Sequence, residues 1–230
     1  MKKNSLLVIV PALNEEKSIL ATIEDIRLYL PASSVLVIDD GSTDDTSKLC
    51  HELRVKVLSL PFNCGVGAAL KVGLAYGVKK RFEAMLILDG DGQHRAVEAQ
   101  KLISRLRENN IVVGYRDYDE YSFSFLRKNA HRLLVTLLRV RSRVKVSDPT
   151  SGFRAFSFRA AKTLSPHIES EYLADTVGIL QLAASRQIEI LEVPVTMKLR
   201  TEGVPSNRGY KLAKRFTLAL LLVLMGRKTK

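Results

Sequence analysis

Short apolar segments alternate with helical patterns along the first half of the chain, and this alternation limits the fold more than any other feature. The apolar, β-branched runs predict buried strands, and the helical patterns recur at the spacing of βαβ units. The predicted strands are residues 6–10, 35–38, 55–60, 85–88 and 111–113, and the predicted helices begin near Asn14 and Asp44 and cover residues 68–78 and 97–106. We expect an α/β fold with a mostly parallel central sheet and helices on both faces.

Polar residues follow each of these predicted strands. In a mostly parallel sheet the carboxyl ends of the strands share one edge, and ligands bind there. The polar clusters are Pro11–Glu15, Asp39–Asp44, Asn63–Gly67, Asp89–His94 and Arg116. Their shared position predicts a functional cleft at one edge of the sheet.

The segment Asp89–Gln93, which follows the predicted strand at residues 85–88, suggests a metal site. The carboxylates of Asp89 and Asp91 and the carboxamide of Gln93 are oxygen ligands that suit Mg²⁺ or Mn²⁺. Substrate phosphates usually complete the coordination of such an ion. An acidic turn without a metal is the alternative, since Asp and Gly are ordinary turn residues.

The net charge of +12 favours an anionic partner, which can be a nucleic acid, an acidic membrane surface or a phosphorylated ligand. A non-catalytic module that binds nucleic acid or membrane would explain this charge but not the carboxylates at the strand ends, so we expect no nucleic-acid partner. A dinucleotide-binding oxidoreductase needs a glycine-rich turn after the first strand, where this chain has Pro11–Asn14. The sequence therefore favours an enzyme that binds a phosphorylated ligand.

The second half is more basic. We expect a basic helix over residues 123–140, a loop over Asp148–Arg154 that leads to a short strand, and a helix over residues 172–184. Strands follow at residues 188–193 and, at the edge of the sheet, 195–199, and residues 201–209 read as a loop. Residues 1–209 are expected to form one domain, and residues 210–230 a separate apolar helix with basic flanks.

This C-terminal helix bears on the location of the protein. Its roughly ten apolar residues would extend about 15 Å, half of what a bilayer core requires. It is expected to lie in the membrane interface, or to pack on its own domain or on a second copy in a homo-oligomer. Cys50 and Cys64 are too few for a disulfide framework, and the apolar run that ends at Pro11 is too short for a signal peptide. We expect a cytoplasmic protein, peripheral on the inner face of the membrane.

Several of these segments resemble known signatures. Val8–Glu16, Val37–Asp44 and Asp89–His94 look like the ordered motifs of family 2 inverting glycosyltransferases. Asn63–Ala69 and Asp148–Arg154 are similar to the branch that contains dolichyl- and polyprenyl-phosphate mannose and glucose synthases. The resemblance extends over roughly residues 6–200 and implies a GT-A fold and a nucleotide-sugar donor, such as GDP-mannose or a UDP-sugar.

The resemblance also implies the residues of the donor site. The base and ribose would contact the ends of the first two strands, and Asp89 would lie beside the ribose or the metal. The expected ligands of Mg²⁺ or Mn²⁺ are Asp89, Asp91 and Gln93. The expected nucleotide-binding residues are Pro11, Ala12, Asn14, Glu15, Asp39, Asp40, Asn63, Gly67, Asp89 and Gly90.

The acceptor implied by the resemblance is a polyprenyl or dolichyl phosphate, which would attack the anomeric carbon with inversion. A phosphate acceptor is already anionic and needs no base, whereas a hydroxyl acceptor, such as a saccharide, would need one, for which Asp148, Glu171 and Asp175 are candidates. The metal and arginines would stabilise the leaving diphosphate. The expected catalytic residues are Asp91, Arg116, Asp148, Arg154 and Asp175, and Arg127 and Arg132 are expected to bind the acceptor phosphate.

The chain departs from the family pattern in its second half. Gly178 stands where many relatives have an acid, Ala130 replaces a serine, and the segment Arg200–Asn207 lacks the usual lysine. These departures leave the donor sugar and the acceptor open. Because the chain has no Trp, it cannot carry the Gln-x-x-Arg-Trp signature of processive synthases, so single-sugar transfer is expected. Of the four histidines, His94 is expected to line the site and the others to lie on the surface.

Overall fold

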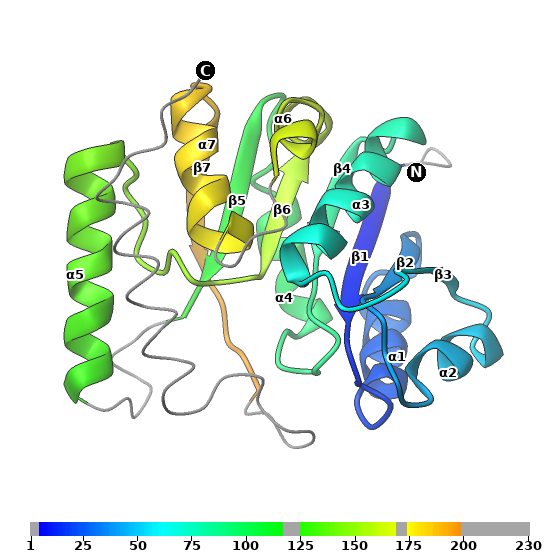
Figure 1. Ribbon diagram of the computed structural model, residues 1–230. Helices are drawn as coiled ribbons and strands as arrows, with labels where there is room; N and C mark the ends of the chain where they lie inside the picture. The colour runs from blue at the N-terminus through cyan, green and yellow to red at the C-terminus, as the bar shows by residue number, and fades with distance from the viewer. Residues whose placement is uncertain (1–4, 117–124, 169–173, 199–230) are drawn as a thin grey trace.

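The computed structural model describes residues 5–116, 125–168 and 174–198. A seven-stranded sheet with the order β3-β2-β1-β4-β6-β5-β7 runs through it (Figure 1). The strands are β1 (Leu6–Ala12), β2 (Ser34–Asp39), β3 (Lys56–Ser59), β4 (Ala84–Ile87), β5 (Asn110–Tyr115), β6 (Arg154–Ser157) and β7 (Glu189–Pro194). Neighbouring strands are parallel except where β6 pairs with β4 and β5. The prediction of a mostly parallel sheet is confirmed.

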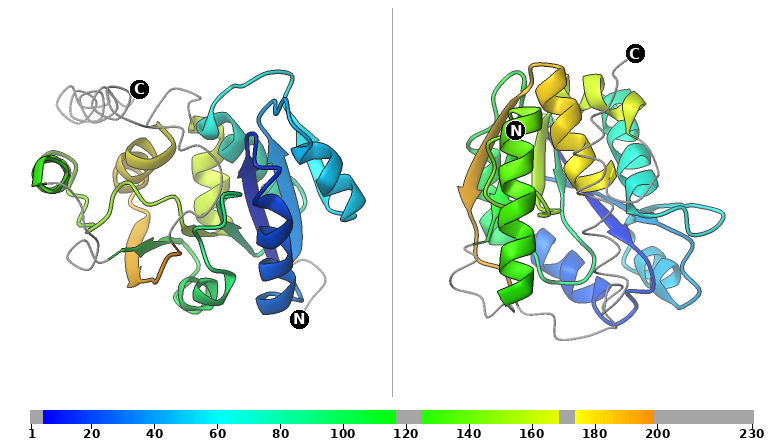
Figure 2. Two further views of the ribbon diagram at one scale, coloured as in Figure 1. Left: turned by 90° about the horizontal axis from the view of Figure 1, so that it is seen from below. Right: turned by 60° about the vertical axis from the view of Figure 1, so that its left-hand side comes forward.

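Helices cover both faces of this sheet (Figures 1 and 2). They are α1 (Ile19–Tyr29), α2 (Thr46–Glu52), α3 (Val66–Lys79), α4 (Ala96–Ile103), α5 (Phe125–Ser142), α6 (Phe158–Leu164) and α7 (Ile179–Ser185), with short turns at Ser165–His167 and Ala174–Gly178. Because side chains alternate across a strand, Leu7 and Ile9 of β1 join the core beneath α3, α6 and α7. Val8 and Val10 join the core beneath α1, α2 and α4.

The antiparallel strand β6 places the second half of the chain at the functional edge. Its amino end lies beside the carboxyl ends of β4 and β5, because Arg154 pairs with Ile87 and with Val113. The loop that enters β6 therefore reaches the edge where the other strands deliver their polar residues. Outside the sheet, α5 packs against α7 beside β5 and β7 (Figure 2).

Three predicted elements differ from the structure. The first helix begins at Ile19 instead of near Asn14, because residues 14–18 form a polar turn. The predicted helix at residues 172–184 is a π-helical turn followed by α7 in its described part. Residues 195–198 are not an edge strand, and the N–H of Lys198 donates to the carbonyl of Gln93 at 2.9 Å. Residues 195–198 therefore contact the turn at Asp89–Gln93.

No helix within the described ranges is long and apolar enough to cross a membrane. Glu171, the segment Arg200–Asn207 and the predicted helix at residues 210–230 lie outside the described residues. The proposed boundary at residue 209 lies there as well, so the two-part organisation stays a prediction.

Candidate active site

The loops that follow β1 and β2 are fastened to each other. The N–H of Asn14 donates to Ser42 Oγ at 3.0 Å, and Asn14 Oδ1 accepts the N–H of Thr43 at 2.8 Å. The N–H of Glu15 donates to Thr46 Oγ1 at 2.8 Å. Because Asn14 adopts a left-handed conformation with φ of 55°, its backbone turns toward β2. The predicted base-binding segment is thus a preformed double loop.

Asp39 and Asp40 at the end of β2 are both buried and shape the neighbouring loops. Asp39 Oδ1 accepts the N–H of Ser42 at 2.9 Å. The two oxygens of Asp40 accept the N–H groups of Cys64 at 2.8 Å and Gly65 at 2.9 Å. Burial raises the pKa of Asp40 against the opposing effect of these two hydrogen bonds. Asp40 therefore holds the loop between β3 and α3.

Gly41 is needed where that loop crosses β2. Its φ is +77°, and a Cβ there would lie 2.6 Å from the carbonyl carbon of Phe62. An alanine would meet both backbone strain and a clash that only a movement of the loop relieves. The residues predicted to contact the nucleotide from this loop, Asn63 and Gly67, are held near β2 in this way. Asn63 Oδ1 accepts the N–H of Gly65 at 3.1 Å, and Gly67 lies in the first turn of α3.

The Asp89–Gln93 turn lies directly beside the end of β1. Gly90 donates its N–H to the carbonyl of Pro11 at 3.3 Å, and its own carbonyl accepts Ser18 Oγ at 2.9 Å. A Cβ on Gly90 would lie 3.5 Å from Cβ of Ala12. Asp91 Oδ1 accepts the N–H of Gln93 at 3.0 Å, which tightens the turn. The structure thus brings the predicted metal ligands together with Pro11 and Ala12.

His94 closes this turn from behind. Its Nδ1 accepts the N–H of Asp89 at 3.0 Å, and its ring stacks on Phe153 with centroids 4.8 Å apart. Burial lowers the pKa of His94 to about 4, and the charges of Asp91, Arg116 and Asp148 act on it as well. The imidazole is therefore neutral near pH 7. His94 contacts the Asp89–Gln93 turn, and its place in the site stays a prediction.

Arg116 at the end of β5 is held by a buried carboxylate. Its Nε donates to Asp148 Oδ2 at 3.1 Å, and the side chain of Asp148 is 0% exposed. Asp148 Oδ1 also accepts the N–H of Thr150 at 3.2 Å and Thr150 Oγ1 at 2.7 Å. The two predicted catalytic residues therefore meet, with Asp148 fixing the direction of Arg116.

His131 on α5 also faces Asp148, with its Nε2 3.9 Å from Asp148 Oδ1. The expectation that His131 lies on the surface is wrong, because the residue is only 6% exposed. His51 and His167 are exposed as expected. The helical period could have predicted this burial. Leu134 and Leu138, three and seven residues after His131, lie on the same face of the helix and are fully buried.

Glu192 on β7 anchors the loop that carries Asp148. Its Oε1 accepts the N–H groups of Ser147 at 2.7 Å and Asp148 at 3.3 Å. Burial raises the pKa of Glu192 against these hydrogen bonds. Glu192 was not among the predicted site residues, because the sequence indicated nothing of this contact, which joins residues distant along the chain.

The remaining predicted arginines differ in exposure. Arg154 is 2% exposed, and its guanidinium donates to the carbonyls of Thr176 at 2.9 Å and Pro149 at 3.1 Å. Arg132 is exposed on α5. Arg127 and Asp175 lie on helical turns, but their side chains are outside the described part of the structure.

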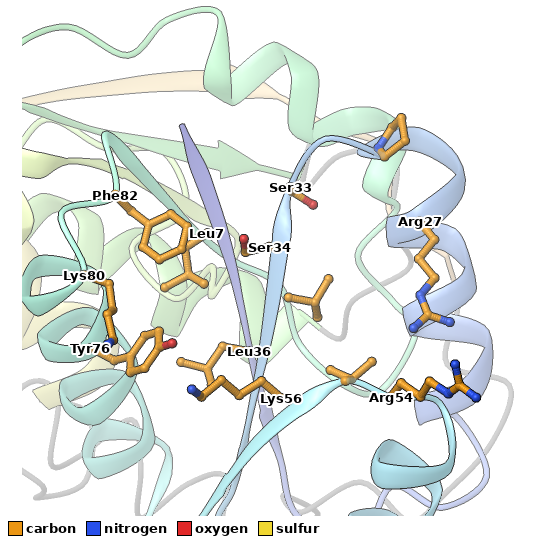
Figure 3. Close-up of a pocket in the computed structure, with 13 residues that line it drawn as sticks. Leu7, Arg27, Ser33, Ser34, Leu36, Arg54, Lys56, Tyr76, Lys80 and Phe82 are labelled. Atoms are coloured by element: carbon orange, nitrogen blue, oxygen red, sulfur yellow. The ribbon is translucent and has the colours of Figure 1, made fainter. Parts of the chain in front are cut away.

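A separate hollow of about 640 Å³ lies at the opposite, amino edge of the sheet (Figure 3). It is basic and has no Asp or Glu in its lining. Arg27 lies in the last turn of α1, Arg54 directly follows the C-cap of α2, and Lys80 is the C-cap of α3. Cations at helix C-termini complement the helix dipoles, which accounts for their presence there. The lining of this hollow has no carboxylate, whereas the predicted metal ligands lie at the carboxyl edge.

Comparison with known proteins identifies the family. The sequence model of glycosyl transferase family 2 matches residues 7–165, which include β1 through α6 and every described loop of the site. The chain belongs to this family. It is a glycosyltransferase, as the sequence motifs indicated.

Several relatives of this family 2 glycosyltransferase have names that refer to a lipid phosphate or its sugar product. A polyprenol monophosphomannose synthase of Mycolicibacterium smegmatis is 25% identical over 214 residues, which cover 88% of this chain and 81% of that protein. An undecaprenyl-phosphate mannosyltransferase of Micrococcus luteus is 27% identical over 212 residues, covering 88% and 87%. A UDP-N-acetylglucosamine–dolichyl-phosphate N-acetylglucosaminyltransferase of Methanococcus voltae is 26% identical over 249 residues, covering 99% of each.

The solved structures that resemble this family 2 chain have the GT-A fold. Glucosyl-3-phosphoglycerate synthase from Mycobacterium tuberculosis, in complex with Mn²⁺, UDP and glucosyl-3-phosphoglycerate, has a TM-score of 0.72 with it. The match covers 96% of this chain and 79% of that chain at 20% identity. The predicted GT-A fold is therefore confirmed.

Proposed function

We propose that this glycosyltransferase moves one sugar from a nucleoside diphosphate donor to a polyprenyl or dolichyl phosphate, with Mg²⁺ or Mn²⁺ at Asp89–Gln93. The observation that carries the proposal is the contact between that turn and the end of β1, where Gly90 bonds to Pro11. This contact puts metal ligands next to the double loop expected to hold the nucleoside. The names of the lipid-phosphate relatives support the acceptor class.

The residues of the turn fit a hard divalent cation. Asp89, Asp91 and Gln93 would hold it through oxygen atoms, as Mg²⁺ and Mn²⁺ prefer. Two carboxylates and one carboxamide would leave coordination positions for the donor diphosphate to complete. A bound ion would supply positive charge to the leaving nucleoside diphosphate.

Arg116 is positioned to bind a phosphate of the donor or the acceptor. Its side chain is 20% exposed, and Nε is directed to Asp148. Because one N–H of the guanidinium is fixed, the direction of the whole planar group is fixed too. An arginine oriented in advance stabilises developing negative charge without reorganising during the reaction. The contact with Asp148 thus supports a catalytic role for Arg116.

The burial of Asp148 favours a phosphate acceptor over a hydroxyl acceptor. A hydroxyl acceptor needs a base within hydrogen-bonding reach. Asp148 is fully buried and accepts hydrogen bonds from Arg116 and Thr150, which suits a positioning role better than that of a base. A polyprenyl phosphate, already anionic, needs no such group. Transfer to a saccharide hydroxyl, with Asp175 as the base, is the second candidate.

The outer face of α5 supports peripheral attachment to a membrane. Leu133 is 50% exposed and Val140 is 72% exposed, and the exposed cations Arg132 and Arg139 flank them. An amphipathic helix with apolar and basic side chains on its exposed face suits the surface of an anionic bilayer. Arg132 would then lie near the head of a lipid acceptor.

A transfer assay with a panel of labelled donors tests the proposal. GDP-mannose, UDP-glucose and UDP-N-acetylglucosamine are each incubated with Mn²⁺ or Mg²⁺ and vesicles that contain polyprenyl phosphate. We expect label from one donor to enter the lipid phase in the presence of metal. Label only on a soluble saccharide would overturn the acceptor, and activity in excess chelator would overturn the metal.

Asp91→Ala tests the metal ligand directly. We expect a loss of at least about 100-fold in activity, as for removal of a main transition-state stabiliser, with an unchanged melting temperature. Glu24→Ala, on the exposed face of α1, is the matched control and retains activity. Retained activity in Asp91→Ala would exclude Asp91 as a required metal ligand.

A further inference from the structure

We propose that His94 is a positioning residue that fixes Asp89, and through it the metal-binding turn; the inference rests on the proposed function. The N–H of Asp89 donates to Nδ1 of His94 at 3.0 Å. A ring nitrogen that accepts a hydrogen bond carries no proton, so the proton of the neutral ring is on Nε2. The tautomer of His94 is thus set by the backbone of Asp89.

The other ring nitrogen faces the same residue. Nε2 lies 3.7 Å from Asp89 Oδ2, which is longer than a hydrogen bond, so His94 bonds to the backbone of Asp89 and lies beside its carboxylate. The side chain of His94 is 5% exposed, whereas that of Asp89 is 38% exposed. The imidazole therefore stands behind Asp89 and leaves the open side of the carboxylate to a ligand. His94 does not itself reach a reacting atom.

The ring is fixed in turn by the second half of the chain. Phe153, which is fully buried, stacks on His94 with an interplanar angle of 14°. The carbonyl of Phe153 accepts the N–H of Gly114 at 2.9 Å, so Phe153 is joined to β5. A Cβ on Gly152 would lie 3.1 Å from Asp89 Oδ2. Asp89 is therefore enclosed between His94 and the loop that enters β6.

This arrangement gives His94 a specific task. Metal ligands are oriented by groups that hydrogen-bond to them from outside the coordination sphere, and loss of such a group typically costs 10- to 100-fold in metal affinity or activity. His94 bonds to the main chain of Asp89, lies beside its side chain and takes its own position from β5 and β6. The position of the proposed metal site therefore depends, through His94, on the packing of β5 and β6.

Two substitutions separate the contributions of the ring. His94→Phe keeps an aromatic ring to stack on Phe153 but leaves the N–H of Asp89 without its acceptor. In His94→Asn, Oδ1 takes the place of Nδ1 as an acceptor, while the stacking is lost. His51→Asn, on the exposed surface of α2, is the matched control.

The measurement is the dissociation constant of Mn²⁺ alone, followed by electron paramagnetic resonance, with the folded fraction checked by circular dichroism. We expect His94→Phe to weaken Mn²⁺ binding about 10- to 100-fold, His94→Asn to weaken it less, and His51→Asn to leave it unchanged. Michaelis constants for the donor should rise in the same order.

Equal Mn²⁺ affinity in wild type and His94→Phe would overturn the role of His94 while leaving the proposed function intact. No Mn²⁺ binding by the wild type would overturn both. If His94→Phe does not fold, Phe153→Leu replaces it, because this change frees the ring while His94 keeps both nitrogens. We then expect a smaller but measurable loss of Mn²⁺ affinity, and an unchanged affinity would contradict the proposal.

Discussion

The two sides of the carboxyl edge are built with different interactions. On the side of β1, β2 and β3, side-chain oxygens accept hydrogen bonds from backbone N–H groups, as Asn14 and Asp40 do. On the side of β5, β6 and β7, Glu192 also accepts backbone N–H groups, and an ion pair between Arg116 and the buried Asp148 is added. The β1–β3 side is therefore held by hydrogen bonds between loops, and the β5–β7 side by such hydrogen bonds together with an ion pair.

This difference changes how the family motifs are interpreted. The acidic residues after β2 suggest ligand contacts, but Asp40 uses both carboxylate oxygens to hold the next loop. The predicted oxygen ligands for a metal lie at Asp89–Gln93, and Arg116 is held by Asp148 at the end of β5. Substitutions on the two sides should therefore fail in different ways.

The largest loss of stability is expected for Asp148→Ala. This change leaves the partly buried guanidinium of Arg116 without its carboxylate, and breaking such a pair costs about 3 kcal/mol or more. The free energy of unfolding, measured in urea, should fall by that amount, and activity should fall because Arg116 loses its orientation. Lys145→Ala, at an exposed neighbouring position, should change little. A loss below about 1 kcal/mol would show that the pair contributes no more than a surface ion pair.

Gly41→Ala should cause the second-largest loss of stability, on the side of β1, β2 and β3. The positive φ and the approach of 2.6 Å to Phe62 predict a cost of about 1–3 kcal/mol and a displacement of the loop that Asp40 holds. Urea unfolding measures the first effect, and calorimetric titration with UDP in the presence of Mn²⁺ measures the second. Unchanged UDP affinity would separate that loop from nucleotide binding.

Asp40→Asn should cost about 1–2 kcal/mol, because the amide retains one acceptor oxygen where the carboxylate supplies two. The N–H of Gly65 or Cys64 then loses its partner. Thermal unfolding measures the effect. A neutral result would mean that water replaces the missing acceptor.

Glu192→Gln should have the smallest effect, because Glu192 uses one oxygen, Oε1, for both N–H groups and glutamine keeps that oxygen. Whether this substitution raises or lowers the free energy of unfolding depends on pH. The pKa of Glu192 is raised above the usual 4.5 by burial, so the folded state holds the proton more tightly than the unfolded state. Stability contributed by this group is present below pH 4.5 and is lost as pH rises through the folded pKa.

Glu192→Gln should therefore flatten the pH dependence of unfolding above pH 4.5 and be neutral or slightly stabilising at pH 7. Urea unfolding at a series of pH values measures this. A steeper dependence in the variant would contradict the sign. The two variants can then be compared. Asp40 accepts one N–H group on each of its two oxygens, whereas Glu192 accepts both N–H groups on a single oxygen.

The sequence predicted the features that depend on neighbouring residues. Apolar runs identified the parallel strands. The polar clusters that follow these strands correctly indicated that Pro11, Ala12, Asp89 and Gly90 lie close together. It did not predict contacts between distant segments. The burial of His131 against Asp148 and the return of residues 195–198 to Gln93 depend on tertiary packing, which periodicity and composition do not report.

The position of β6 has a consequence for folding. Strands β1 to β4 come first in the chain and form one continuous half of the sheet, and the connection from β3 to β4 crosses over β2 and β1. The open side of β4 has no partner until β6 arrives, after β5 and α5 have been made. During synthesis from the ribosome, β4 therefore presents an exposed edge able to pair with other chains. The Asp89–Gln93 turn is made early, but its final position depends on β6, the last strand to enter the sheet centre.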